Sequence, residues 1–382
     1  MGSVDSYHPP PMRPESLAFL RSLLDTPSPS GHERAGQRKW LAYVRPFATS
    51  TWNDAYGNCF ASLEPPGWND HDPQRAITVA VCGHADEIGL MVNHIDEKGF
   101  VYCRAIGGID TTSIVGKRVR FASTVVTPEG PVGDVLGVIG ATAIHLQDRT
   151  GEPKVRKLHE LFIDIGAADA EAARKRLRIG DVGVFCDSFE ALSDDIVIAR
   201  ALDNRIGTFA AAEALRLCHA EHANLKVRVV AVSTVQEEIG LHGAAMIADS
   251  LRPDVCLVTD VGHATDSPGI SHAQHGHFKL AAGPKLAVGA EMHPEVVARL
   301  EASAERQGIP LQRSATPGAS GTDTDAIFLA RGGIPCGLVS LPIRYMHTTV
   351  EMTSLRDLRQ ISEVFAGFAL GLESRTRFVP TL

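Results

Sequence analysis

One segment, residues 226–240, constrains the fold more than any other part of the chain. It begins with KVRVVAVST, a β-branched and almost unbroken apolar run that is typical of a strand buried on both faces. The adjacent acids Glu237 and Glu238 follow this strand, and a helical pattern begins after Gly243. A buried strand that leads through a short turn into a helix predicts an α/β fold, and in open sheets of this kind ligands bind at the carboxyl ends of the strands.

Glu237 and Glu238 place two carboxylates next to each other at that strand end. Like charges this close repel each other, so the pair is unfavourable unless a cation neutralises it. A metal ion, with one acid as ligand and the other as proton carrier, is the simplest explanation. Two solvated acids in a surface loop are the alternative, which this segment alone leaves open.

Length and composition narrow the class of protein. A chain of 382 residues is too long for one ordinary core, so two domains are expected and three are compatible with this length. Hydrophobic residues make up 44% and charged residues 21%, as in globular proteins. The net charge of −8 and the lack of a Lys/Arg block argue against a nucleic-acid partner. No stretch reaches the ~18 unbroken apolar residues of a membrane span, so no membrane partner is expected either.

The cysteines and the start of the chain bear on the compartment. The seven cysteines are scattered and form no CxxC pair, so we expect reduced, mostly buried thiols in a cytoplasmic protein. Residues 1–14 are polar and proline-rich without an apolar centre, which predicts a flexible tail rather than a signal peptide.

A second buried strand, residues 76–82, runs straight into His84 and Asp86. These two residues are two positions apart, so on an extended strand end their side chains share one face. The pattern suits a metal-bound imidazole with a carboxylate close behind it. A His-x-Asp sequence is also common in surface loops, so this segment does not decide between the two interpretations.

Three further residues occupy comparable positions. Asp260 ends an apolar strand, and His347 lies just past the last predicted strand, residues 335–341. Asp203 opens a long helix, where it is either a ligand or simply the N-cap. A loop between these strands is rich in histidine, but its irregular spacing favours surface or site-rim residues over ligands; the histidines are His263, His272, His275 and His277.

The carboxyl ends of parallel strands meet at one edge of a sheet, so these residues are expected to converge. Two histidines and three carboxylates are the ligand set expected for two divalent metals roughly 3.5–4 Å apart that share one carboxylate. Nitrogen and oxygen donors without thiolate suit zinc, cobalt or manganese rather than a structural cysteine site.

The region from residue 90 to residue 195 has a different sequence pattern. It consists of short strand-like runs separated by glycine and proline turns, such as GFVYCR, KRVRF and GDVLGVIG. Residues 167–177 form its one clear helical pattern. This is typical of a small antiparallel β-barrel or sandwich, and its position between two α/β segments predicts an inserted domain.

Several motifs together resemble the M42 family of cocatalytic metallo-aminopeptidases, which includes the TET peptidases and glutamyl aminopeptidases. They include GHADEIG (83–89), AIGGID (105–110), ARALDNRIG (199–207), QEEIGLHGA (236–244), DVGHATDSPG (260–269), GTDTDAIFLARGGIP (321–335) and RYMHTTVE (344–351). The resemblance covers nearly the whole chain after about residue 15, and the order of the motifs and the inserted β region agree with it.

The resemblance implies a fold and a ligand set. The fold is a three-layer α/β/α dimetal exopeptidase domain, residues 15–89 plus 196–382, with a β-barrel domain for dimerisation or oligomerisation inserted at 90–195. The implied metal sites, two divalent ions per subunit, share Asp203; His84 and Asp260 complete one site, and Glu238 and His347 complete the other.

The resemblance also implies roles for two further acids, Glu237 as general base and Asp86 as a carboxylate that contacts a ligand. The chain departs from the family pattern at Asn204 and Thr348, where the family often has Asp and Ser. Neither is a ligand position, so we expect these two differences to modify the activity rather than abolish it. The resemblance further implies a homo-oligomer built from dimers, commonly of twelve subunits.

These observations favour a metal-dependent aminopeptidase acting on short peptides. A deacylase or carboxypeptidase acting on N-acylated amino acids would use the same centre on a different bond. A metal-bound assembly protein without turnover is the alternative from another class, and it would not need Glu237.

Overall fold

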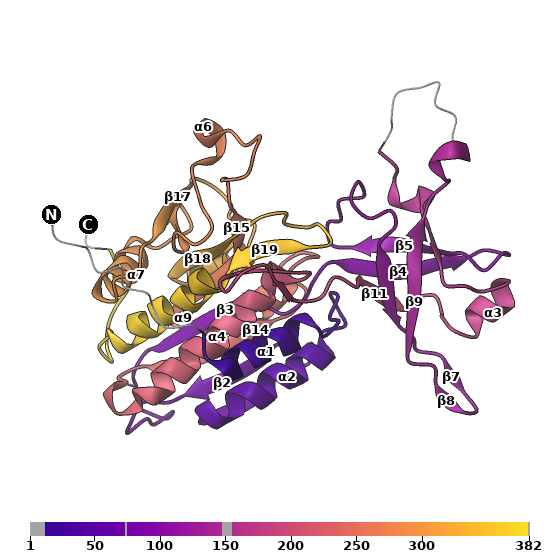
Figure 1. Cartoon of the computed structure of the whole chain (residues 1–382). Helices are drawn as coiled ribbons and strands as arrows, with labels where there is room; N and C mark the ends of the chain where they lie inside the picture. Colours follow the sequence, from indigo (N-terminus) through magenta and orange to yellow (C-terminus); the bar gives the residue numbers. More distant parts are fainter. Residues whose placement is uncertain (1–11, 73–74, 147–154, 381–382) are drawn as a thin grey trace.

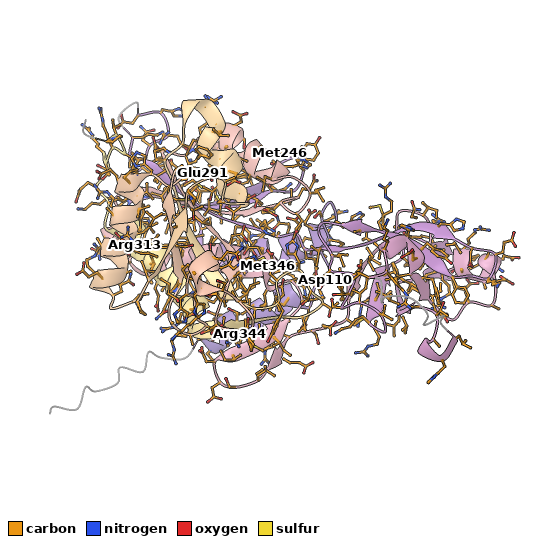
Figure 2. All side chains as sticks on the ribbon, turned by 90° about the horizontal axis from the view of Figure 1, so that it is seen from above. Asp110, Met246, Glu291, Arg313, Arg344 and Met346 are labelled. Carbon is orange, nitrogen blue, oxygen red and sulfur yellow. The ribbon has the colours of Figure 1, made fainter. Side chains whose placement is uncertain are left out.

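The computed structural model describes residues 12–72, 75–146 and 155–380. The chain forms a larger α/β lobe and a smaller barrel lobe that extends from one end of it (Figure 1). Seen from above, Asp110 lies in the narrow region between the two lobes (Figure 2). Of the tail expected at residues 1–14, residues 1–11 lie outside the described chain, and helix α1 (Pro14–Leu24) already begins at the last tail position.

The larger lobe is built on an eight-stranded sheet in the order β1-β2-β14-β3-β15-β18-β16-β17. In that order its strands are β1 (Ser50–Asn53), β2 (Cys59–Leu63), β14 (Arg228–Thr234), β3 (Thr78–His84), β15 (Val255–His263), β18 (Cys336–Ile343), β16 (Lys285–Gly289) and β17 (Gln312–Thr316). The central strands β14, β3, β15 and β18 run parallel, so their carboxyl ends lie at one edge. Every residue of β3 and β18 is buried, as the long apolar runs predict.

Helices cover both faces of this sheet. Helix α4 (Leu202–Ala220) packs against β3, β14 and β15, and α1, α2 (Arg34–Val44) and α9 (Leu355–Leu370) lie against α4. Helix α7 (Pro294–Arg306) contacts α9, and α5 (His242–Leu251) contacts α8 (Asp323–Leu329). A Cβ atom at Gly83 of β3 would meet the backbone of Gly207 in α4, so this side of β3 faces α4. The predicted three-layer α/β/α fold is confirmed.

The smaller lobe is a closed barrel with the strand order β10-β5-β4-β11-β6-β9. In that order its strands are β10 (Phe162–Asp164), β5 (Val101–Ile106), β4 (Gly89–Ile95), β11 (Val182–Phe185), β6 (Arg118–Ala122) and β9 (Asp134–Gly140). Burial alternates along β6 and β9, so one side of each strand fills the interior. This interior is a separate hydrophobic core around Ile114, Phe121 and Ile163, as expected for the predicted β-barrel.

Short elements complete the chain. Strands β12 (Glu190–Ala191), β13 (Ile196–Ala199) and β19 (Glu351–Ser354) form a small antiparallel sheet, and β7 (Val126–Thr127) pairs with β8 (Gly130–Pro131). The remaining described helices are α3 (Ala170–Arg174), α6 (His272–His275) and five 3-10 turns: Arg45–Phe47, Ile144–Leu146, Leu158–Glu160, His222–Asn224 and Ala330–Gly332. Of the helices in the described ranges, none combines the length and apolarity that a bilayer crossing requires.

The sequence analysis differs from the structure in two places. The helix predicted at 167–177 is shorter, because α3 covers only Ala170–Arg174, and Asp169 caps its start by accepting a hydrogen bond from the backbone N–H of Ala172 at 2.8 Å. Strands β16 and β17 were not expected from the sequence. The residues of β17, QRSAT, contain no apolar run because this strand lies at the edge of the sheet and none of its residues is fully buried.

Gly83 and Gly207 let β3 and α4 approach each other closely. A Cβ atom added at Gly83 would lie 2.3 Å from the carbonyl carbon of Gly207. Because that neighbour is backbone, the helix would have to move. We expect Gly83→Ala to lower the free energy of unfolding by about 1–3 kcal/mol, as overpacking does elsewhere, and denaturant titration measures this.

Gly318→Ala is the matched control, because a Cβ there meets nothing within 4 Å. It should change the free energy of unfolding by less than about 0.5 kcal/mol. Equal stability of the two variants would show that β3 and α4 tolerate a wider separation.

Candidate metal centre

The parallel strands deliver four of the predicted site residues. His84 is the last residue of β3, and Glu237 and Glu238 lie in the turn between β14 and α5. Asp260 lies inside β15, so the prediction that this strand ends at Asp260 is wrong. The strand continues because it stays paired with β18 up to His263. Asp260 nevertheless lies at the same edge of the sheet as the other three.

Asp203 and His347 approach this edge from outside the sheet. Asp203 lies in the first turn of α4 with non-helical backbone angles, and no side chain caps that helix, so Asp203 is not an N-cap. His347 lies in the turn between β18 and β19. The buried carboxylate of Glu351 accepts hydrogen bonds from both backbone N–H groups, at 2.9 Å from Asp203 N and 3.1 Å from His347 N. Glu351 therefore ties the two segments together.

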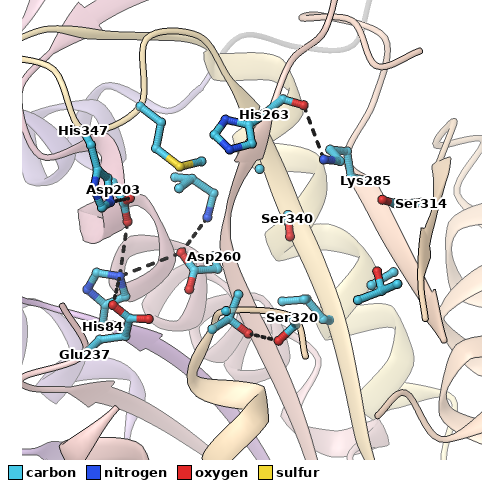
Figure 3. A pocket seen from close by; sticks show the side chains of 18 of the residues that line it. His84, Asp203, Glu237, Asp260, His263, Lys285, Ser314, Ser320, Ser340 and His347 are labelled. Carbon is cyan, nitrogen blue, oxygen red and sulfur yellow. Dashed lines mark hydrogen bonds and ion pairs between the residues drawn. The ribbon is translucent and has the colours of Figure 1, made fainter. Parts of the chain in front are cut away.

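The carboxylate of Asp203 lies between two imidazoles (Figure 3). Its Oδ1 is 3.2 Å from Nε2 of His84, and its Oδ2 is 3.3 Å from Nε2 of His347. Glu237 Oε2 and Asp260 Oδ1 lie 3.6 Å and 3.8 Å from Nε2 of His84. Side chains from distant parts of the chain thus meet in one cluster.

Glu238 completes this cluster, with Oε2 3.6 Å from Nε2 of His347. Three sets of donor atoms, each within 4.8 Å of one another, are compact enough to hold an ion: His84–Asp203–Asp260, Asp203–Glu238–His347 and His84–Glu237–Glu238. The first two share Asp203, the residue that the family resemblance implies is common to two sites. Oε1 of Glu238 is buried without a hydrogen-bond partner, which is unfavourable for a carboxylate unless a cation contacts it. The residues therefore fit bound divalent cations.

The centre concentrates negative charge where little water reaches it. Burial raises the pKa of Glu237 to about 7 and that of Glu238 to about 10, and the charge of Asp203 adds to both shifts. Burial also acts to raise the pKa of Asp203, but hydrogen bonds to His347 and His84 outweigh it and lower this pKa to about 2. A divalent cation would reverse the upward shifts and keep the carboxylates ionised.

Asp86 supports the centre from behind. Its Oδ1 lies 3.3 Å from Nδ1 of His84, which leaves Nε2 of that ring directed at the cluster. The same carboxylate accepts hydrogen bonds from the backbone N–H groups of Glu237 at 3.0 Å and Glu238 at 3.1 Å, and from the hydroxyl of Ser30 at 2.6 Å. One buried acid therefore fixes both the imidazole and the acidic turn.

This geometry agrees with a comparison to known families. Residues 69–364 match the family model described as M42 glutamyl aminopeptidase. The chain belongs to the M42 glutamyl aminopeptidase family. As an M42 peptidase it is a hydrolase that acts on peptides, and the deacylase and non-catalytic alternatives are not favoured.

Relatives of this M42 peptidase align over most of its length. The lysyl aminopeptidase of Pyrococcus furiosus is 31% identical over 89% of this chain and 92% of its own. The TET aminopeptidase of a marine-sediment Thaumarchaeota archaeon superposes with a TM-score of 0.85 at 28% identity, covering 94% of this chain and 98% of that one. The Pyrococcus horikoshii TET1 peptidase, which can assemble into a tetrahedron or an octahedral shell, gives a TM-score of 0.78 at 29% identity, covering 94% and 100%.

The M42 motif AIGGID contributes to the centre in a way that sequence reasoning missed. Gly107 and Gly108 lie between β5 and the rest of the barrel lobe, and a Cβ there would meet Glu238 Oε2 at 3.1 Å and His347 Nδ1 at 3.0 Å, respectively. The backbone N–H of Asp110 also donates to the carbonyl of His347 at 3.4 Å. The two adjacent glycines in the sequence could have indicated this contact, because only a residue without a Cβ atom lets a loop pack so closely on the centre.

The histidine-rich segment of the M42 peptidase divides into two parts. His263, at the end of β15, lines the pocket that holds the centre. His272 stacks on His277 with ring centroids 4.1 Å apart, and neither belongs to a set of donor atoms described above. His263 therefore belongs to the pocket lining, whereas His272 and His277 lie outside it.

Proposed function

We propose that the protein is a metal-dependent aminopeptidase that removes N-terminal residues from short peptides and holds two divalent cations per subunit. The observation that carries this proposal is the position of Asp203, whose two carboxylate oxygens each face a different imidazole. A carboxylate placed in this way suits two cations that share it. In the proposed assignment Asp203 is shared, His84 and Asp260 complete one site, and Glu238 and His347 complete the other.

The donor set contains nitrogen and oxygen atoms and no thiolate, which suits Zn²⁺ or Co²⁺, with Mn²⁺ as the third candidate. Divalent cations held there would supply Lewis acidity that polarises the peptide carbonyl and makes water a stronger nucleophile at neutral pH. The protein's own contribution is to position the donors and to move the proton.

Glu237 is the proposed general base. Its Oε2 lies 3.6 Å from Nε2 of His84, at the edge of the cluster, and the hydrogen bond from its backbone N–H to Asp86 fixes its position. Glu237 takes a proton from the attacking water as the oxygen bonds to the peptide carbonyl carbon. It then gives that proton to the amide nitrogen as the C–N bond breaks, which releases an amino acid and a peptide amine.

This function predicts that a dipeptide with a free amino terminus is hydrolysed and that its N-acetyl form is hydrolysed at least roughly 100-fold more slowly, because a site built to bind the amine rejects a substrate without it. Chelator treatment should abolish activity, and Co²⁺, Zn²⁺ or Mn²⁺ should restore it. Chromatography of the released amino acid measures both effects.

Faster hydrolysis of the N-acetyl dipeptide would indicate the deacylase or carboxypeptidase alternative instead. Hydrolysis of neither peptide with any of the three cations would contradict the proposal, provided that metal analysis shows that the cations are bound.

We also propose that residues 15–89 and 196–382 form the catalytic domain and that residues 90–195 form an oligomerisation domain of a homo-oligomer built from dimers. The barrel has a core of its own, and its surface exposes the apolar side chains of Val126, Leu136 and Val138, which is typical of an interaction surface. A dodecamer is the first assembly to test, by light scattering of the purified protein.

The proposed location is the cytoplasm. All seven cysteines are free thiols, which suits a reducing compartment.

A further inference from the structure

A second cleft lies between the start of helix α2 and the turn that joins β1 to β2. Helix α2 packs beside β2 in the larger lobe (Figure 1). The volume of the cleft is about 500 Å³, within the usual range of small-molecule sites. Among the described residues, none lines both this cleft and the pocket of the metal centre. The two cavities are nevertheless close along the chain, because Val235 lines the cleft and Glu237 lines the pocket.

The floor of the cleft carries a hydrogen-bond acceptor without a donor. Gln37 is 4% exposed, and its Nε2 donates to the carbonyls of Gly57 at 3.0 Å and Ser233 at 2.9 Å. These two bonds fix the amide, and its Oε1 is buried without a hydrogen-bond partner in the described part of the chain. An acceptor buried in this way is unfavourable until a donor reaches it.

Glu33 provides a second acceptor one helical turn before Gln37. Its Oε1 accepts hydrogen bonds from the backbone N–H groups of Gly31 at 2.7 Å and Gln236 at 3.2 Å, and no bond to its Oε2 forms within the described ranges. Burial raises the pKa of Glu33 to about 7, and the charge of Asp86 adds to this shift. A cationic group in the cleft would lower this pKa and keep the carboxylate ionised.

Two arginines stand at the rim of the cleft. Arg34 and Arg38 are four positions apart, so they lie on one face of α2, and both are exposed. Neither forms an ion pair with another described residue. Asp54, an acid of the lining, is already engaged: its Oδ1 accepts three backbone N–H groups at 2.9 to 3.0 Å, and its Oδ2 accepts from the side-chain amide of Asn58 at 2.6 Å. The guanidinium groups are therefore available to an anionic ligand.

We propose that this cleft binds a free α-amino acid, with its ammonium group at the acceptors of the floor and its carboxylate at the two arginines of the rim. Acceptors and arginines occupy adjacent positions along the chain, so the two charged ends of the ligand must be close together. In an α-amino acid both are attached to one carbon atom. The carboxylate would receive charge-assisted hydrogen bonds from Arg34 and Arg38, and an apolar side chain would lie against Leu41 and Tyr56, which also line the cleft.

Other ligands satisfy only half of this site. A simple anion would pair with the arginines and leave the acceptors of the floor without donors, and a simple amine would do the reverse. The inference goes beyond the proposed function. An α-amino acid is also a product of the proposed reaction, but its binding in the cleft requires no turnover.

The test titrates the Co²⁺-loaded protein with L-leucine by calorimetry and follows the visible absorption of the bound Co²⁺ over the same additions. Leucine that reaches the cation cluster changes this spectrum, whereas leucine in the cleft does not. We expect saturable binding at a site that leaves the spectrum unchanged. Two analogues, 4-methylpentanoate without the ammonium group and 3-methylbutylamine without the carboxylate, should each bind there at least roughly 10-fold more weakly, because each loses hydrogen bonds to a charged group.

The variant Arg34→Gln/Arg38→Gln should weaken leucine binding at this site at least roughly 10-fold. Lys39→Gln/Arg45→Gln is the matched control, because both residues are exposed, lie outside the cleft lining and carry the same total charge. It should leave the affinity unchanged. Glu33→Gln should remove most of the advantage of leucine over 4-methylpentanoate. The melting temperature of each variant shows whether it is folded.

Three results would overturn the inference. They are the absence of any leucine site that leaves the Co²⁺ spectrum unchanged, equal leucine affinity of the wild type and Arg34→Gln/Arg38→Gln, and equal affinity of the cleft for leucine and 4-methylpentanoate, which would make it a site for anions only. Peptide hydrolysis is measured separately. A protein that binds leucine in the cleft and hydrolyses no peptide would overturn the proposed function and leave this inference intact.

Discussion

Replacing Glu237 by Gln is expected to lower kcat by roughly 10²- to 10⁴-fold, the usual contribution of a general acid–base group, and to leave the bound metal in place. Gln keeps the size of the side chain and its position in the turn, which the backbone N–H of Glu237 secures through Asp86. It loses the ability to accept and return a proton. Steady-state kinetics on a free dipeptide, together with metal analysis of the same sample, measures the two effects separately.

The neighbouring acid provides the control. Glu238→Gln removes one carboxylate from the group Asp203–Glu238–His347, so it should lower the metal content as well as the activity. The distinction is needed because Glu237 also lies in a compact donor set with His84 and Glu238. A Glu237→Gln protein that has lost metal would make Glu237 a ligand, and one that retains full activity would refute its role as base.

The strand-borne part of the centre could be predicted from the sequence because its causes are local. A β-branched apolar run identifies a buried strand, and the residue at its end must then lie at the edge of the sheet. His84, Glu237 and Glu238 follow from this reasoning. Asp260 was also placed at this edge, although the predicted strand ended too early. The end of β15 could not be predicted from its own residues, because pairing with β18 extends the strand to His263.

The other contributions are tertiary and leave little trace in the local pattern. Glu351 lies in β19 and acts on Asp203, 148 positions earlier in the chain. Lys285 lines the pocket that holds the centre, and it belongs to β16, a short strand that is only partly buried and was not predicted. Its position in the pocket depends on the pairing of β16 with β18 and on the absence of a side chain at Gly262.

The second large effect concerns stability. Glu87→Gln is expected to lower the free energy of unfolding by about 3–5 kcal/mol, the usual result of removing one partner from a buried ion pair. Glu87 is 2% exposed and lies between β3 and β4, where the chain passes from the larger lobe into the barrel. Its Oε1 accepts a hydrogen bond from Nη2 of Arg205 at 2.8 Å, and its Oε2 accepts one from Nη1 of Arg200.

The size of this effect comes from the two arginines that remain. Arg200 and Arg205 are both buried, and without the negative charge of Glu87 they face each other in a region that excludes water. The loss therefore measures uncompensated positive charge rather than the net contribution of the ion pairs. Glu171→Gln removes an acid from the exposed pair with Lys175 and should change the free energy of unfolding by less than about 0.5 kcal/mol. If denaturant titrations gave the two variants the same stability, Arg200 and Arg205 would have to find other partners or water when Glu87 is neutral.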